Sequence, residues 1–203
     1  MLKRIALGAL LLCAGFSAGC GAARPSNYYQ LTPASSGATT AASSPYPVTL
    51  LIGRLTASHL YREDRIVYSS GSEQMGAYES QRWAEPPTEM LEEAMLRELR
   101  ASGRYRSVGS LTSNARGDFL LRGHLVDFKE ISGKSLLARV SFELEVRETK
   151  TGLTVWTHSY SHDEPVNGKE ISAVVAALNQ NVQRGVSEVA ASLDQYFSTH
   201  PPN

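Results

Sequence analysis

The sequence is poor in cysteine, has no excess of either charge, and lacks the motifs of the common enzyme classes. It has two cysteines in 203 residues, and twenty basic residues balance twenty acidic ones. Without a basic run the chain lacks the electrostatic signature of a nucleic-acid-binding protein, so we expect no nucleic-acid partner. Serine-nucleophile, zinc-protease, CxxC and phosphate-binding glycine motifs are also missing. His158 and His162 would lie about 13 Å apart on a strand, too far to share an ion. We therefore expect a protein that is not an enzyme and that holds no metal or cofactor.

The N-terminal segment predicts a signal peptide over residues 1–19. Lys3 and Arg4 precede an apolar stretch of twelve residues, which is shorter than the roughly 20 residues of a membrane-spanning helix. Small residues then lead into Cys20 in a pattern that resembles the bacterial lipobox, where the cysteine carries a covalent lipid and becomes the mature N-terminus. The alternative is ordinary secretion with a free thiol at Cys20. Because Cys13 falls inside the signal peptide, the exported chain keeps Cys20 alone and can form no internal disulfide.

The mature chain is predicted to be a short tether followed by one domain. Residues 20–27 form the tether, which spans about 25 Å when fully extended, and residues 28–200 form the domain. Residues 32–47 contain only Thr, Pro, Ala, Ser and Gly apart from Tyr46, a composition that predicts a flexible loop. The strand-like residues 28–31 are too few to fold alone, so this loop does not separate two domains.

Hydrophobic periodicity predicts an α+β fold: a mostly antiparallel sheet covered by two helices, the C-terminal one long. Apolar residues at helical spacing predict one helix between Pro86 and Gly103 and a second over residues 169–197. Strict alternation over residues 136–147 predicts a strand whose even-numbered side chains face the core. The other predicted strands are residues 48–55, the hairpin strands 65–69 and 74–78, and residues 119–128 and 153–162, which flank the alternating strand in a meander.

Two aromatic clusters are the candidate functional residues. Tyr28 and Tyr29 stand next to the tether, and Arg82 and Trp83 stand just before the first predicted helix. These side chains either pack the edge of the core or form a partner-binding surface, since Tyr, Trp and Arg are favoured as interface anchors. Under the second alternative, all four residues lie on the surface.

The order of these segments resembles the ABC-type transport auxiliary lipoproteins of the PqiC/YmbA-like group. The similarity rests on the lipobox cysteine Cys20, the segment Tyr28-Tyr29-Gln30-Leu31, and the segment Arg82-Trp83-Ala84-Glu85-Pro86 that opens a helix. A serine- and alanine-rich linker, a meander of strands and a final amphipathic helix complete the pattern. The resemblance covers nearly the whole mature chain.

The resemblance implies a non-catalytic docking component of a transport system that moves lipid between two membranes. Its implied partners are an MCE-domain protein of an ABC transporter and further copies of the same chain, arranged in a ring. Gly21 stands where enteric bacteria place the aspartate that retains lipoproteins on the inner membrane, so we expect residence on the outer membrane, facing the periplasm. The alternative is an envelope-assembly or regulatory lipoprotein similar to those that activate cell-wall synthases.

Overall fold

The computed structural model describes residues 25–32, 45–71, 73–111 and 116–202, so the signal peptide and Cys20 lie outside the described residues. The described elements are β1 (Asn27–Tyr29), β2 (Tyr46–Ala57), α2 (His59–Arg62), β3 (Arg65–Ser70), β4 (Met75–Trp83), α3 (Pro87–Ala101), β5 (Tyr105–Ser110), β6 (Phe119–Ser132), β7 (Leu137–Glu148), β8 (Thr154–Pro165) and α4 (Ile171–Thr199).

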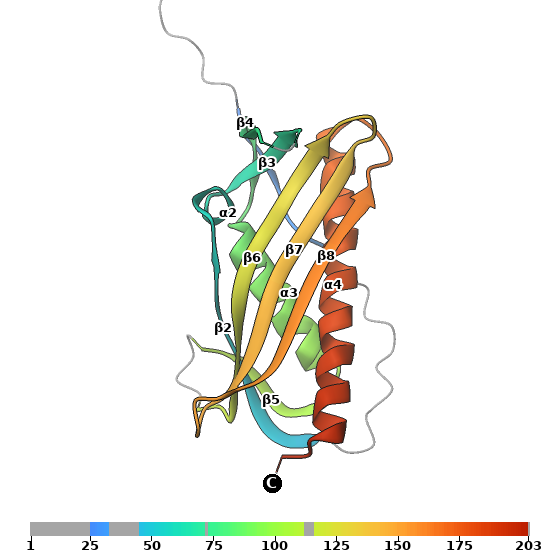
Figure 1. Ribbon diagram of the computed structural model, residues 1–203. Coiled ribbons are helices and arrows are strands. Elements are labelled where there is room, and N and C mark those ends of the chain that lie inside the picture. The colour runs from blue at the N-terminus through green and yellow to red at the C-terminus, as the bar shows by residue number, and fades with distance from the viewer. Residues whose placement is uncertain (1–24, 33–44, 72, 112–115, 203) are drawn as a thin grey trace, which may run out of the picture.

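The sheet is organised around β6, the longest strand (Figure 1). Along one edge β6 pairs in parallel first with β2 and then with β3, and along its other edge it pairs with β7 in antiparallel. β8 continues the antiparallel meander beside β7. On the side of the sheet that holds β2 and β3, β5 pairs with β2, β4 pairs with β3, and β1 pairs with β4. The meander confirms the predicted antiparallel sheet, and the parallel pairings of β1, β2, β3 and β5 are additions that the sequence did not indicate.

Two helices pack against the sheet and against each other, as Figure 1 shows. The helix α3 lies on β2 and β5, and α4 lies along β7 and β8. α3 begins at Pro87 and is followed by Gly103, whose φ of +61° suits glycine at the end of a helix. α4 has 29 residues. The predicted α+β fold with two covering helices, the second of them long, is therefore confirmed.

The alternating strand β7 has the predicted faces. Its inward side chains, which come from five even-numbered residues, are between 0% and 3% exposed: Ala138, Val140, Phe142, Leu144 and Val146. The opposite face carries polar side chains that pair across strands. Arg139 donates two hydrogen bonds of 2.7 Å to Asp163 on β8, and Arg122 on β6 lies 2.6 Å from Glu145. The Arg139 guanidinium lowers the pKa of Asp163 through these hydrogen bonds.

The apolar stripe of α4 contains two residues that periodicity did not select. Asn181 is fully buried, and its amide donates hydrogen bonds of 2.8 Å to the carbonyls of Ala138 and His162. Its Oδ1 accepts a hydrogen bond of 2.7 Å from the Tyr160 hydroxyl. One turn later, a Cβ added to Gly185 would lie 2.8 Å from the Tyr160 ring. A buried amide and a glycine therefore set how closely α4 approaches the sheet.

Several predicted boundaries need correction. β6 extends beyond 119–128 through Ser132, and β8 covers 154–165 rather than 153–162. The first strand covers 27–29 rather than 28–31, and β4 extends beyond 74–78 through Trp83. The predicted loop over 32–47 falls mostly outside the described residues, but its end is not loop, because β2 already begins at Tyr46. The hydroxyl of Tyr46 donates a hydrogen bond of 2.7 Å to Asp194 on α4, a long-range contact that composition could not indicate.

Candidate partner-binding site

The two candidate aromatic segments, more than fifty residues apart in the sequence, lie side by side in the structure. β1 pairs in parallel with the last residues of β4, so that Tyr28 lies opposite Arg82 and Tyr29 lies opposite Trp83. The pairing continues beyond the strand, where the Ala84 amide donates a hydrogen bond of 2.7 Å to the Tyr29 carbonyl. Main-chain hydrogen bonds therefore join the segment next to the predicted tether to the segment that opens α3.

Tyr28 and Arg82 provide the accessible part of this site. Tyr28 is 63% exposed. Among the described residues, it is the one aromatic residue in the group of exposed large apolar residues. Arg82 is less free, because its Nη1 donates a hydrogen bond of 2.6 Å to Asp64. This ion pair is partly exposed and stabilises the fold only modestly. It does hold the guanidinium in one position beside β1.

Trp83 does not lie on the surface, so the expectation that it is a surface residue is wrong. It is 1% exposed, and its ring packs edge-to-face on Phe128 of β6 with 5.4 Å between the ring centroids. Its Nε1 has no hydrogen-bond partner in the described part of the chain. Successive residues of a strand point to opposite faces, so Arg82 can be accessible while Trp83 packs the core. Tyr29 is half-buried and donates a hydrogen bond of 2.9 Å to Gln81.

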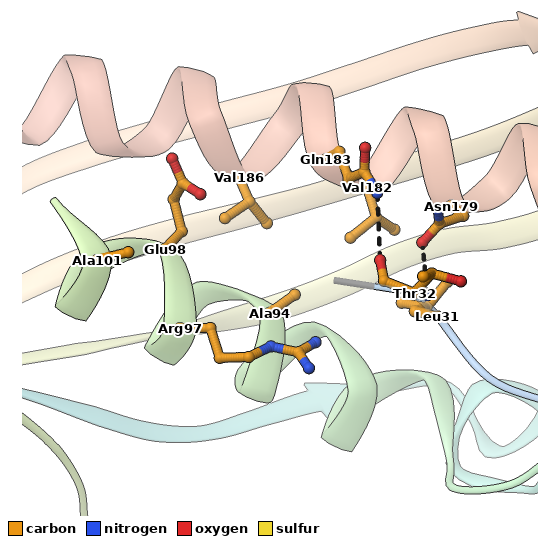
Figure 2. A pocket seen from close by; sticks show the side chains of 10 residues that line it. All are labelled: Leu31, Thr32, Ala94, Arg97, Glu98, Ala101, Asn179, Val182, Gln183 and Val186. Atoms are coloured by element: carbon orange, nitrogen blue, oxygen red, sulfur yellow. Dashed lines mark hydrogen bonds between the residues drawn. The ribbon is translucent and has the colours of Figure 1, made fainter. Parts of the chain in front are cut away.

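After β1 the chain crosses to the two helices, and residues 30–32, which we call the strap, dock there. Figure 2 shows Leu31 between α3 and α4, where it is 8% exposed. The Thr32 amide donates a hydrogen bond of 3.0 Å to Asn179, and the Thr32 carbonyl accepts one of 3.2 Å from Gln183. Asn179 and Gln183 lie off the apolar stripe of α4, where helical periodicity gives no sign of a tertiary contact. Only the tertiary contact reveals that they bind the strap.

A groove of about 600 Å³ lies beside the start of α3 and continues the site beyond Glu85. Its wall includes Arg54 and Glu92, and Glu92 accepts a hydrogen bond of 2.6 Å from the Leu55 amide. Burial raises the pKa of Glu92, and the Leu55 amide opposes this shift. Glu92 therefore supports β2 where its pairing with β6 is irregular. Among the described residues, no group of three or more His, Cys, Asp and Glu side chains could hold a metal ion.

The comparison with known families decides the affiliation of this chain. A family model described as the ABC-type transport auxiliary lipoprotein component matches residues 29–190. The chain belongs to this family. The match includes the strap, the segment from Arg82 to Pro86, and most of α4. The resemblance inferred from the two aromatic segments is therefore confirmed. A search of curated proteins found no match.

Solved structures show that this auxiliary lipoprotein shares its fold with two proteins of known structure. A protein from Xanthomonas campestris, assigned to a family of unknown function (DUF330), has a TM-score of 0.72 and 19% identity; the alignment covers 83% of this chain and 98% of that one. An uncharacterized protein has a TM-score of 0.65 and 14% identity, over 83% of this chain and 99% of the other. A PelC dodecamer from Paraburkholderia phytofirmans reaches 0.42 at 12% identity, over 70% of this chain and 91% of that one. That last score is too low to carry an argument about fold or assembly.

The affiliation identifies the chain as an auxiliary component of ABC-type transport and as a lipoprotein. Cys20, the residue expected to carry the lipid, lies outside the described residues. In the part of the chain that the structure describes, no helix has the length and apolar character needed to span a membrane.

Proposed function

We propose that this lipoprotein is a non-catalytic docking component of an ABC transport system that moves lipid between two membranes. The observation that carries the proposal is the β1–β4 pairing, which brings together the two aromatic segments on which the resemblance to the family rests. The family is described by transport rather than by a reaction. A site that offers an exposed tyrosine and a fixed guanidinium is suited to protein recognition.

The proposed partner is an MCE-domain protein of the transporter, bound by several copies of this chain arranged in a ring. The proposed location is the outer membrane, with the domain facing the periplasm and a covalent lipid on Cys20. Several tethered copies around one partner would gain avidity, because linkage raises the effective concentration without any new contact. A lipid anchor on Cys20 would keep these copies on the membrane. Stable attachment needs more than one acyl chain, and the modified cysteine of a bacterial lipoprotein carries several.

Replacing Cys20 with serine is expected to release the protein from the membrane. Serine offers no thiol for acylation, so the variant should move from the membrane fraction to the soluble periplasmic fraction. The measurement is fractionation with a mass analysis of the N-terminus of the wild type. A variant that is still processed and stays with the membrane would show that Cys20 is not the anchor.

Replacing Tyr28 with alanine is expected to weaken partner capture without unfolding the domain. The side chain is 63% exposed, so its removal changes stability little, while loss of an interface tyrosine typically costs about 1–2 kcal/mol of binding, or roughly tenfold in affinity. The measurement is capture of a purified MCE-domain protein by the wild type and by Tyr28→Ala, with circular dichroism to confirm folding.

Leu153→Ala provides the matched comparison, because Leu153 is 66% exposed in the turn between β7 and β8, at the opposite end of the sheet. If partner capture fell for Leu153→Ala but not for Tyr28→Ala, the docking site would lie at that turn rather than at Tyr28. Capture of a cell-wall synthase in place of the MCE-domain protein would favour the envelope-assembly adaptor instead.

A further inference from the structure

We infer that one end of the domain rests on the lipid headgroups of the membrane that holds the anchor. This tether end consists of residues 73–75 at the β3–β4 hairpin, residues 133–135 between β6 and β7, and residues 167–170 before α4. The far end consists of residues 149–153 between β7 and β8. The inference rests on the proposed anchor at Cys20 and adds an orientation to it.

Strand directions place the entry of the chain at the tether end. β6 runs from the far end, where Phe119 pairs with Glu148, towards the β6–β7 turn. β3 is parallel to β6, β4 is antiparallel to β3, and β1 is parallel to β4. β1 therefore runs away from the tether end, and its first residue, Asn27, lies closer to that end than Tyr29 does. Figure 1 shows the described chain entering beside β4, opposite to the turn between β7 and β8.

The length of the sheet makes the far end unreachable for the anchor. Tyr29 lies at about the level of Val140 along the sheet, because Trp83, which is opposite Tyr29, packs on Phe128. Phe128 in turn pairs with Val140. The eight residue-to-residue steps of β7 from Val140 to Glu148 span about 27 Å at 3.3–3.4 Å each. The two steps of β1 from Tyr29 back to Asn27 add about 7 Å in the opposite direction.

Asn27, the first residue of β1, is therefore about 34 Å from the far end, whereas the seven steps from Cys20 to Asn27 reach about 25 Å at most. A domain whose anchor is inserted in the membrane cannot turn its far end to that membrane.

The surface of the tether end suits close contact with headgroups. Its charged side chains, Lys134 and Lys169 against Glu73 and Glu170, are all exposed and cancel one another, so neither a neutral nor an anionic surface repels it. At the hairpin tip Met75 is 41% exposed. A flexible apolar side chain of this kind can enter the interface between headgroups and acyl chains.

This orientation leaves the candidate partner-binding site accessible. Five residues of β4 separate Met75, at the hairpin tip, from Gln81, where the pairing with β1 begins. Tyr28 and Arg82 therefore lie on the side of the domain rather than beneath it. The far end points away from the membrane, towards a complex that arrives from the other membrane.

The test uses the full lipidated protein in vesicles of phosphatidylethanolamine and phosphatidylglycerol, with single cysteines labelled by an environment-sensitive fluorophore. The label sites are Met75→Cys at the tether end, Leu153→Cys at the far end, and Ser159→Cys on the exposed face of β8. Because the mature chain has only Cys20, and acylation blocks it, the wild type should take up no label.

We expect a blue shift and strong quenching by nitroxide-labelled lipid at position 75, several-fold above that at 153 and 159. Quenching centred on Ser159→Cys would mean that the sheet lies flat on the membrane, and quenching centred on Leu153→Cys would mean that the domain is inverted. Equal weak quenching at all three sites, with the protein still on the vesicles, would mean that no part of the domain touches lipid. Each of these results overturns the orientation while the anchor stands. A wild type that takes up label and leaves the vesicles would overturn the anchor, and the orientation with it.

Discussion

Replacing Asn181 with leucine is expected to lower the free energy of unfolding by roughly 3 kcal/mol. Leucine has a similar size, so the change leaves no large cavity, but it removes the amide that donates to the carbonyls of Ala138 and His162 and accepts from Tyr160. The Tyr160 hydroxyl retains a hydrogen bond of 3.1 Å to the Asn181 carbonyl. The two strand carbonyls lose their donor, that of Ala138 in a buried and that of His162 in a partly buried position, and a buried polar group without its partner costs about 1–3 kcal/mol.

Urea denaturation measures this effect, and Gln180→Leu is the matched control on the same helix. Gln180 is exposed, so its replacement should change the unfolding free energy by about 0.5 kcal/mol or less. If Asn181→Leu were as stable as Gln180→Leu, the amide hydrogen bonds would contribute nothing to the free energy of unfolding. Apolar packing alone would then hold α4 on the sheet.

Replacing Val140 with aspartate is expected to unfold the domain or bring it close to unfolding. Val140 is 0% exposed and lies between Phe128 and His162 on the inward face of the meander. A carboxylate at this position has no partner and cannot reach water, at a cost of several kcal/mol. That loss is comparable to the total stability of a small domain, about 5–15 kcal/mol. The thermal midpoint by circular dichroism, or the loss of the cooperative transition, is the measurement.

Glu143→Ala is the control on the same strand, because Glu143 is exposed on the opposite face. Its thermal midpoint should stay close to that of the wild type, since surface substitutions usually change stability by about 0.5 kcal/mol or less. Equal midpoints for Val140→Asp and Glu143→Ala would contradict the assignment of the two faces of β7.

The sequence was most informative where one face of an element is apolar. The alternation over residues 136–147 identified β7 and its buried face, and helical spacing identified α3 and α4 to within a few residues. These patterns are local, because burial of one face of a strand or helix leaves a period of 2 or 3.6 in the chain itself. The short segment β5 and the single turn α2 carry no such period, and the sequence did not indicate them.

The candidate site shows where local information ends. The sequence drew attention to Tyr28, Tyr29, Arg82 and Trp83 but could not assign them to faces. Tyr28 is 63% exposed and Trp83 is 1% exposed. In a short strand the face of each residue depends on register, and register depends on the strand beside it. The family pattern therefore selected two segments that pair with each other, while the register decided that Trp83 packs the core and is not a surface residue.

The sequence by itself determined the α+β class, the two covering helices, the faces of β7 and the membership of a transport-auxiliary lipoprotein family. Each of these follows from periodicity or from contiguous motifs. Only the tertiary structure decided that β1 pairs with β4, that Asn179 and Gln183 hold the strap, and that Asn181 is buried. These contacts join residues far apart in the chain. A polar side chain on a helix looks the same in the sequence whether it faces water or a strand carbonyl, because its partner is supplied by another element of the fold.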